Sequence, residues 1–330
     1  MRRLTAFLMC AALVACPHPS EGPDGGEDGG PPDGGEDAGD DAGFDAGPED
    51  AGPFDAGPDL RCPPRDGGVP DGGLMRVVAA NLTSGNQQSW SPGDGQRILQ
   101  GLKPDVVLMQ EFKVGTSSEV DRRAFVDSTF GAEFCFHIEA GGGIPNGVVT
   151  RWPILDAGQW ADPQVSNRGF AWAQIDVPGQ KDLWAVSVHL LTTGSQRNAE
   201  AQALVANINQ FIPAGDLLVI GGDLNSSTRT EAAVVTLGQV VRVAGPHPVD
   251  RGNNSNTNAG RTQPYDWVLP DPDLYALQVP VWVGDAGYDA GLVFDSRVFT
   301  PLSDVAPAEL GDSAAVNMQH MAVVKDFLLP

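Results

Sequence analysis

The stretch Leu217-Leu218-Val219-Ile220-Gly221-Gly222-Asp223-Leu224-Asn225 is an apolar run that passes through two glycines into polar residues. Four consecutive apolar residues predict a strand covered on both faces, because a half-exposed strand would alternate apolar and polar residues. A helix is predicted just before it, beginning near Ser195, with apolar positions at helical spacing between 201 and 212. Pro213 and Gly215 then end that helix. A helix followed by a buried strand is typical of an α/β domain.

Other apolar runs predict further strands on both sides of this stretch. The predicted strands cover residues 75–81, 105–110, 148–154, 170–177, 183–189, 266–269, 277–283 and 321–324. Ile98, Leu99 and Leu102 predict a short helix, which Pro104 ends. Many strands with a few interspersed helices predict two packed β-sheets flanked by helices, a four-layer α/β sandwich.

The N-terminus has the layout of a secretory signal over residues 1–16. Arg2 and Arg3 precede an apolar run, Leu4 to Val14, that is too short to span a bilayer. Ala15-Cys16 then resembles the bacterial lipobox, in which the cysteine becomes the lipidated N-terminus. We therefore expect an exported protein, lipid-anchored through Cys16 to the outer or cell-surface membrane of a bacterium. An ordinary signal peptide with an incidental cysteine is the alternative.

Residues 17–73 contain few residues that could form a core. They repeat Asp-Gly-Gly and Asp-Ala-Gly and hold 16 acidic residues against two arginines. Low hydrophobicity with high charge cannot offset the entropy cost of ordering, so this segment is expected to be a disordered acidic tether. An acidic tail that binds a partner is the alternative.

Residues 74–330 are expected to form one domain with a large core, acting as a monomer. The chain has a net charge of −23, of which the signal contributes +2 and the tether −14, so this domain has −11. An acidic domain does not bind nucleic acid through a broad basic face. Cys62 and Cys135 could form a disulfide after export, or Cys135 could be a buried strand residue; both readings stay open.

Several predicted strands end abruptly in a polar or ionisable residue. One such end usually marks the point where a strand meets solvent, but a repeated pattern predicts a rim where strand ends converge. The residues are Asn81, Glu111, His189, Asp223 with Asn225, and Asp266, while His320 stands just before the last strand.

In this order, the motifs resemble those of the endonuclease/exonuclease/phosphatase superfamily, which includes deoxyribonucleases, abasic-site endonucleases, bacterial sphingomyelinases and inositol-polyphosphate phosphatases. The motifs are Asn81, Gln110-Glu111, Ser187-Val188-His189, Gly222-Asp223-Leu224-Asn225, Asp266-Trp267-Val268 and His320. The resemblance covers residues 75–327 and implies a deoxyribonuclease-like sandwich. Gly-Asp-x-Asn alone would be a weak signal, since these are turn-forming residues.

The resemblance implies a divalent-metal site. Glu111 would be the main ligand, with Asn81 beside it and Asp223 at the metal as well. Mg²⁺ is the expected ion, with Mn²⁺ or Ca²⁺ as alternatives, because hard cations prefer oxygen ligands and neutralise phosphoryl oxygens. Asp223 would also orient or deprotonate the attacking water, and Asn225 would donate a hydrogen bond to the phosphate.

The same resemblance implies two imidazoles at the phosphate. Asp266 would fix the tautomer of His320 and favour its charged form, and His189 would contact the phosphate as well. Asn146 resembles a family asparagine near the substrate. Arg151 and Arg168 are further candidates for phosphate binding, although a simple surface charge explains each of them equally well.

One position departs from the family pattern. The family usually has an aspartate directly before the last histidine, whereas this chain has Gln319. A neutral amide cannot supply the missing negative charge, which puts the metal affinity or a second metal in doubt. Asp304 or Asp312 is a hypothetical substitute.

The expected activity is metal-dependent hydrolysis of phosphate esters, with extracytoplasmic DNA or RNA as the first substrate and a nuclease or other phosphodiesterase as the enzyme class. A phospholipid esterase resembling sphingomyelinases, or a sugar-phosphate esterase, is the alternative among enzymes. The sequence shows no exposed aromatic hairpin that would favour lipid. A non-catalytic binding module that keeps the fold is the alternative of another class, supported only by Gln319.

Overall fold

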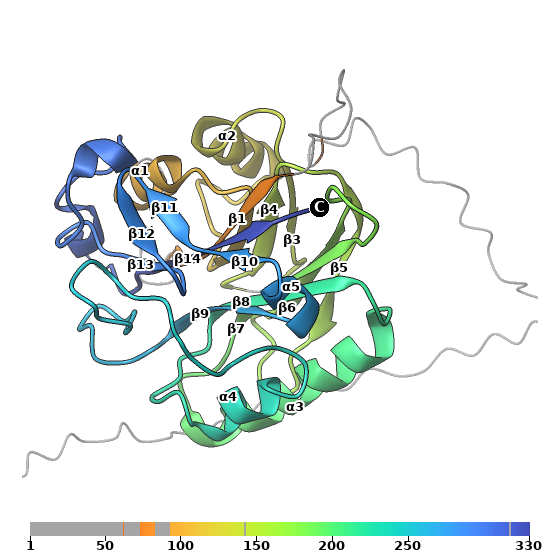
Figure 1. Cartoon of the computed structure of the whole chain (residues 1–330). Coiled ribbons are helices and arrows are strands. Elements are labelled where there is room, and N and C mark those ends of the chain that lie inside the picture. Colours follow the sequence, from red (N-terminus) through yellow and green to blue (C-terminus); the bar gives the residue numbers. More distant parts are fainter. Residues whose placement is uncertain (1–61, 63–72, 83–92, 142, 317) are drawn as a thin grey trace, which may run out of the picture. The chain divides into compact units, whose positions relative to one another are not determined.

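Two β-sheets face each other in the computed structural model, which describes residues 62, 73–82, 93–141, 143–316 and 318–330 (Figure 1). The first sheet has the order β10 (Gln278–Val279), β14 (Ala322–Leu328), β1 (Leu74–Asn81), β2 (Val106–Gln110), β4 (Gly147–Thr150) and β3 (Cys135–Ile138), and β13 (Leu292–Phe294) also pairs with β14. The second sheet has the order β5 (Ile154–Ala161), β6 (Gly169–Ile175), β7 (Leu183–His189), β8 (Leu217–Asp223) and β9 (Asp266–Pro270).

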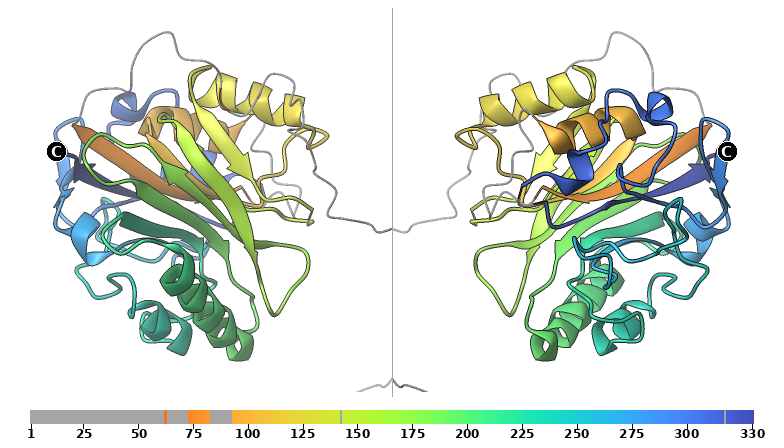
Figure 2. Two further views of the ribbon diagram at one scale, coloured as in Figure 1. Left: turned by 90° about the vertical axis from the view of Figure 1, so that its right-hand side faces the viewer. Right: turned by 90° about the vertical axis from the view of Figure 1, so that its left-hand side faces the viewer.

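Helices cover the outer face of each sheet (Figures 1 and 2). Helices α1 (Asp94–Leu102) and α2 (Glu119–Thr129) pack on the first sheet, and α3 (Gly194–Phe211) and α4 (Ala232–Leu237) pack on the second. Strand β1 shows why both faces are apolar: Val77 and Ala79 face the other sheet, whereas Val78 and Ala80 face the helical layer. The predicted four-layer α/β sandwich is therefore confirmed.

The two sheets approach closely where β2 crosses β8. A side chain on Gly222, whose φ is +137°, would put its Cβ 2.6 Å from Nε2 of Gln110 on β2 and 2.1 Å from the carbonyl oxygen of Val188 on the neighbouring strand β7. The amide of Gln110 on β2 donates to Ser187 Oγ on β7 across 2.9 Å, which links the sheets. The glycine pair before Asp223 is thus a packing requirement as well as a strand end.

Two predicted strands proved wrong because each is divided in the structure. The run 148–154 is split into β4, which ends at Thr150, and β5, which begins at Ile154 in the other sheet. Pro153 lies between them and has no N–H to donate to a ladder. The run 277–283 is similarly divided into β10 and β11 (Val281–Val283).

Helix α2 was missed by the sequence analysis, although its start has a recognisable signal. The hydroxyl of Ser118 accepts a hydrogen bond from the backbone N–H of Asp121, and acidic residues occupy the first turn. The other elements not predicted are α4, α5 (Pro272–Tyr275), β12 (Ala286–Tyr288), β13 and the 3₁₀ helices η2 (Leu302–Val305) and η3 (Asp312–Ala314). Most are shorter than the window that periodicity needs.

An aromatic hairpin stands on the surface, contrary to the expectation from sequence. Strands β11 and β12 pair antiparallel, and Trp282 between two buried valines is 60% exposed. The three-residue strands were too short to be recognised as a hairpin in the sequence.

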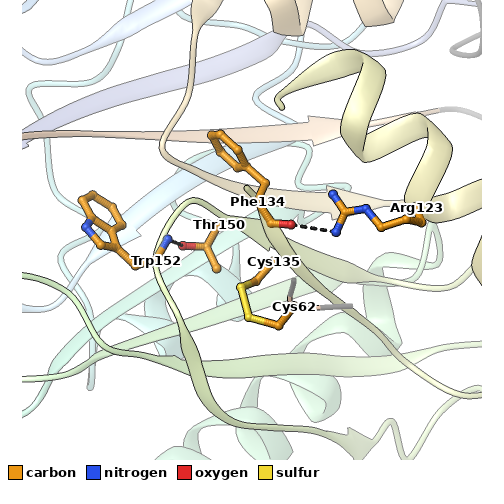
Figure 3. Close-up of a disulfide and its surroundings, with 6 residues drawn as sticks. All are labelled: Cys62, Arg123, Phe134, Cys135, Thr150 and Trp152. Carbon is orange, nitrogen blue, oxygen red and sulfur yellow. Dashed lines mark hydrogen bonds between the residues drawn. A yellow bond between two sulfur atoms is a disulfide. The ribbon is translucent and has the colours of Figure 1, made fainter. Parts of the chain in front are cut away.

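Cys62 and Cys135 form a disulfide, which resolves the alternatives left open above (Figure 3). Cys135 is also a fully buried residue of β3, so both readings of it apply. The predicted signal with Cys16 and all of the tether except Cys62 and Gly73 lie outside the described residues. Among the helices of the described ranges, none has the length and apolar character of a membrane span.

Candidate active site

The strand ends that carry polar residues meet at one end of the sandwich. Parallel pairing places Asn81 at the end of β1 opposite Gln110 at the end of β2. In the second sheet, Asp223 is paired with His189 on one side and with Asp266 on the other. The carboxyl ends of parallel strands share one edge, and the antiparallel β9 begins at that edge with Asp266, so residues far apart in sequence are brought together.

Asp223 stands at the centre of this cluster. Its Oδ2 atom lies 3.1 Å from Asn81 Nδ2, 3.3 Å from His189 Nε2 and 3.6 Å from His320 Nε2. The side chain is 1% exposed. Burial raises the pKa of Asp223 to about 7, a shift that His320 opposes and Asp266 reinforces. A carboxylate with such a pKa is suited to accept a proton near neutral pH.

Asn81 connects Asp223 to Glu111. Its Nδ2 atom also lies 3.4 Å from Glu111 Oε1, so one amide lies within reach of both carboxylates. Glu111 follows the end of β2 in a left-handed conformation, with φ of 53°, and is 7% exposed. Strain of this kind at a non-glycine residue is typical of functional sites, because the surrounding structure must hold it.

Asn225, like Glu111, has a left-handed backbone conformation, and it is held by hydrogen bonds. Its φ is 48°, its backbone N–H donates to Asp223 Oδ1 at 2.8 Å, and its amide donates to the carbonyl of Leu190 at 2.9 Å. The structural reading of Gly-Asp-x-Asn as a turn is therefore correct for the backbone. The side chain of Asn225 still reaches the cluster, because its Nδ2 atom lies 3.3 Å from Asp223 Oδ2.

His320 and Asp266 form the predicted contact. Nδ1 of the imidazole lies 3.1 Å from both carboxylate oxygens of Asp266. Burial by itself would lower the pKa of His320, but Asp266 and Asp223 outweigh it and raise the pKa to about 9. The imidazole is therefore charged at neutral pH and can donate a proton or bind an anion.

His189 differs from His320 in charge. Burial lowers the pKa of His189 well below its ordinary value, and the cationic groups of Arg168 and His320 add to the effect. Its Nδ1 atom is buried and has no hydrogen-bond partner among the described residues. The site thus combines one neutral and one charged imidazole around a single carboxylate.

The donor atoms of the cluster fit a divalent metal in two overlapping ways. Asp223, Asp266 and His320 each offer a ligand atom, and these atoms lie within 4.8 Å of one another. Glu111, Asn81 and Asp223 offer oxygen ligands only, if the Asn81 amide turns its Oδ1 toward the ion. In the first set Asp266 and His320 also contact each other, whereas the second, predicted set offers a hard cation oxygen ligands alone.

Asn146 lies at the same end of the first sheet, next to Gly147, which is paired with Met109 of β2. The sequence analysis missed the residue that holds it. Glu139 accepts hydrogen bonds from the backbone N–H groups of Asn146, at 2.6 Å, and of Gly169, at 2.7 Å. Glu139 could not be recognised from the sequence, because a glutamate directly after a short strand is usually a charged surface residue.

The two candidate arginines have opposite outcomes. Arg168 Nε donates to the carbonyl of His189 at 2.5 Å, so it lies at the rim of the cluster. The prediction for Arg151 is wrong: it pairs with Asp105 at 2.9 Å, at the start of β2. Strand β4 runs antiparallel to β2, so a residue after its end lies at the edge opposite to Glu111.

Neither substitute for the missing aspartate joins the cluster. Asp312 is buried and bound by Arg97 of α1, and Asp304 lies exposed on η2. The side chain of Gln319 is exposed, and its carbonyl accepts the N–H of Ala259 at 2.7 Å. Position 319 therefore supports the backbone around His320 and supplies no charge.

A family comparison agrees with this geometry. The profile of the endonuclease/exonuclease/phosphatase family matches residues 95–304, more than half of the chain. A comparison with curated protein sequences finds no significant match.

Several solved structures have the same fold. An endonuclease/exonuclease/phosphatase from Bacteroides vulgatus has a TM-score of 0.53 at 17% identity, covering 78% of this chain and 99% of that one. Truncated TDP2 from Caenorhabditis elegans has a TM-score of 0.51 at 15% identity, covering 77% and 97%. Humanized TDP2 from D. rerio has a TM-score of 0.50 at 14% identity, covering 77% and 98%. At these identities the likeness concerns the fold.

Proposed function

Because the chain belongs to the endonuclease/exonuclease/phosphatase family, we propose that it is a divalent-metal-dependent phosphodiesterase that uses the cluster around Asp223. The observation that carries this proposal is the convergence on Asp223 Oδ2 of an amide and two imidazoles from β1, β7 and the segment before β14. A structural role alone does not explain so many buried polar groups at one strand edge.

A metal held by Glu111, Asn81 and Asp223 would neutralise charge on the phosphoryl oxygens. Asp223 would accept the proton of the attacking water, because it is the buried carboxylate on which the amide and both imidazoles converge. The charged His320, held by Asp266, would stabilise the phosphate or protonate the leaving oxygen. Asn225, the neutral His189 and Arg168 at the rim would bind the remaining phosphate oxygens.

The proposed substrate is DNA or RNA outside the cytoplasm. The domain has a net charge of −11, so the grip on such a substrate would be local, through the metal and the groups around it. A phospholipid substrate is the second candidate, and the exposed Trp282 on the β11–β12 hairpin favours it. A binding module without activity is disfavoured by the complete set of Glu111, Asp223 and His320.

We also propose that the mature chain begins at a lipidated Cys16 and that residues 17–73 tether the domain to the membrane as a monomer. The proposal rests on the residue order around Cys16. Labelled palmitate should enter the wild-type protein in a bacterial host and not a Cys16→Ala variant. Equal labelling of both would contradict it.

The activity test uses the purified chain and several substrates in parallel: plasmid DNA, RNA, sphingomyelin and a generic phosphodiester, each with Mg²⁺ and with a chelator. We expect chelator-sensitive hydrolysis of at least one, with a nucleic acid turned over fastest. Glu111→Gln should require more Mg²⁺ for half-maximal rate, since it loses a charged ligand.

A matched control is Glu119→Gln, which removes a carboxylate from the exposed start of α2. It should retain the wild-type rate and Mg²⁺ requirement. Hydrolysis that persists unchanged in chelator would contradict the metal requirement, and no turnover of any substrate would favour the binding module.

A further inference from the structure

A second pocket, lined mainly by basic and apolar residues, lies at the outer edge of strand β9, on the side away from β8. Four basic residues from separate parts of the chain line it: Arg229, Arg242, His247 and Lys325. The domain as a whole carries a net negative charge, so a wall with four basic groups is unexpected there. None of the four belongs to the cluster around Asp223.

These basic groups have no acidic partners among the described residues. Arg229 Nη2 donates to the carbonyl of Ser255 at 2.6 Å, and its guanidinium lies 5.6 Å from the ring centroid of Trp267. The guanidinium of Arg242 lies 4.1 Å from the ring centroid of Tyr275. These contacts are with neutral groups, so no carboxylate balances either charge, and solvent reaches Arg242.

Lys325 is the most deeply placed of the four. It is 6% exposed on β14, and its Nζ donates to the side-chain oxygen of Gln278 at 2.9 Å. Buried charges in proteins are normally paired, because removing an ion from water costs several kcal/mol or more. Burial, together with the neighbouring Arg242, lowers the pKa of Lys325 to about 8. A bound anion would therefore offset the desolvation free energy of the buried Lys325 ammonium group.

The one carboxylate in the pocket lining is not available to these cations. Both oxygens of Asp266 lie 3.1 Å from Nδ1 of His320, on the side of the candidate active site. Burial, with Arg229 and Lys325 nearby, lowers the pKa of His247 to about 4. His247 is therefore neutral at pH 7, and the cations of Arg229, Arg242 and Lys325 have no other acid in the lining to balance them.

The backbone of β9 adds a neutral donor. The backbone N–H of Asp266 donates to Thr257 Oγ1, and the backbone carbonyl of Pro270 accepts from the N–H of Arg242. The backbone N–H and C=O groups of the even-numbered residues of β9 therefore point away from β8. Val268 lies between them and lines the pocket, and by the alternation of an antiparallel strand its N–H points to the same outer edge. Backbone N–H groups beside cations are typical of oxyanion sites.

We propose that this pocket binds a phosphate group, through Lys325, Arg242, Arg229 and the N–H of Val268. Several donors from different directions match the several acceptor oxygens of a phosphate better than the two of a carboxylate. The ligand is either free inorganic phosphate or a phosphate carried by a larger molecule. The inference does not depend on the proposed activity, since none of these groups takes part in it.

Binding of inorganic phosphate to the full chain, measured by calorimetry in chelator and at low salt, tests the proposal. We expect saturable binding that weakens about tenfold or more in Lys325→Met and in Arg242→Gln, since each removes a charge-assisted hydrogen bond. Lys181→Met is the matched control, because it removes an exposed lysine that pairs with Asp273 elsewhere. It should bind phosphate as the wild type does.

A second variant separates this pocket from the candidate active site. Arg168→Gln removes a cation at the rim of that site without touching Asp266, and should leave the phosphate affinity within about twofold of wild type. Loss of binding in Arg168→Gln with retention in Lys325→Met would overturn the proposal. So would the absence of binding to the wild type at millimolar phosphate. Thermal unfolding of each variant confirms that it is folded.

The source of the phosphate is distinguished by competition. A dinucleotide with a 5′-phosphate should displace inorganic phosphate if the pocket takes a phosphate on a larger molecule, and the same dinucleotide without that phosphate should not. Displacement by neither identifies free phosphate as the ligand. Displacement by both would overturn the proposal, because recognition would then depend on another part of the molecule.

Discussion

Two groups of ionisable side chains lie beside strand β9, yet they balance charge differently. In the candidate active site, acidic residues and imidazoles alternate, and the charged His320 lies between Asp223 and Asp266. In the pocket on the outer edge of β9, the buried Lys325 and the exposed Arg242 have no acidic partner, because His320 holds the one carboxylate of the lining. The first arrangement can hold a cation and a phosphate together, whereas the second is complementary to an anion alone. The sign of the local charge, more than the degree of burial, separates their roles.

The largest effect should come from removing the central charge of the first group. Asp223→Asn keeps the shape of the side chain but cannot accept a proton or hold a cation as a carboxylate does. We expect the turnover rate to fall by roughly 10³-fold or more, within the range for losing a catalytic acid or base. Rates are measured on the best substrate of the panel above. A fall of less than tenfold would show that the cluster is not the reaction centre.

The next effect concerns the charge on His320. In Asp266→Asn the largest favourable charge next to the imidazole is lost, so its pKa should fall from about 9 toward its ordinary value of 6.5 or below. As the pH is raised, the variant should lose the imidazolium, and the activity that needs it, at a lower pH than the wild type does. At neutral pH its turnover rate should fall on the order of 10²-fold. NMR titration of the imidazole and a pH–rate profile test this. An unchanged titration would contradict the dyad.

The two groups should also have opposite effects on stability. The pKa of Lys325 is lowered from 10.5 to about 8, so the unfolded chain binds more protons in that interval and stability should rise with pH between them. The pKa of His320 is raised, so its contribution is complete below pH 6.5 and is lost as the pH rises through about 9.

Lys325→Met isolates one of these contributions. It removes an unpaired buried charge, so the free energy of unfolding at pH 7 should increase on the order of 2 kcal/mol. The rise in stability above pH 8 should disappear as well. Denaturant unfolding across this pH range measures both. A variant less stable than the wild type at pH 7 would show that the charge is compensated after all.

The smallest effect separates the two arginines. Arg168→Gln removes a cation at the rim of the candidate active site, so KM should rise by roughly threefold to tenfold. Arg151→Gln should leave both kinetic constants unchanged, because Arg151 pairs with Asp105 at the opposite edge of the first sheet. A matched loss in both variants would mean that the substrate covers a far larger surface than the cluster.

The strand ends were predictable because a buried strand appears in the sequence as a run of apolar residues. An apolar run that ends in Asn81, His189 or Asp223 can be read directly, and all three prove to be buried at one edge. Strands and helices too short to show a repeating pattern of apolar residues could not be predicted. The β11–β12 hairpin with Trp282 belongs to this class, as do the positioning contacts of Glu139, whose partners are backbone groups.

The sequence by itself determined the layers, the order of the polar strand ends and the chemical types available to the site. Only the tertiary structure decided which further residues meet: it joined Glu139 to the backbone of Asn146, placed Arg151 at the opposite edge from Glu111 and gathered Lys325 with Arg242. The physical reason is that strand periodicity is a local property, whereas the edge that a residue reaches depends on strand direction and sheet register, which are set by long-range pairing.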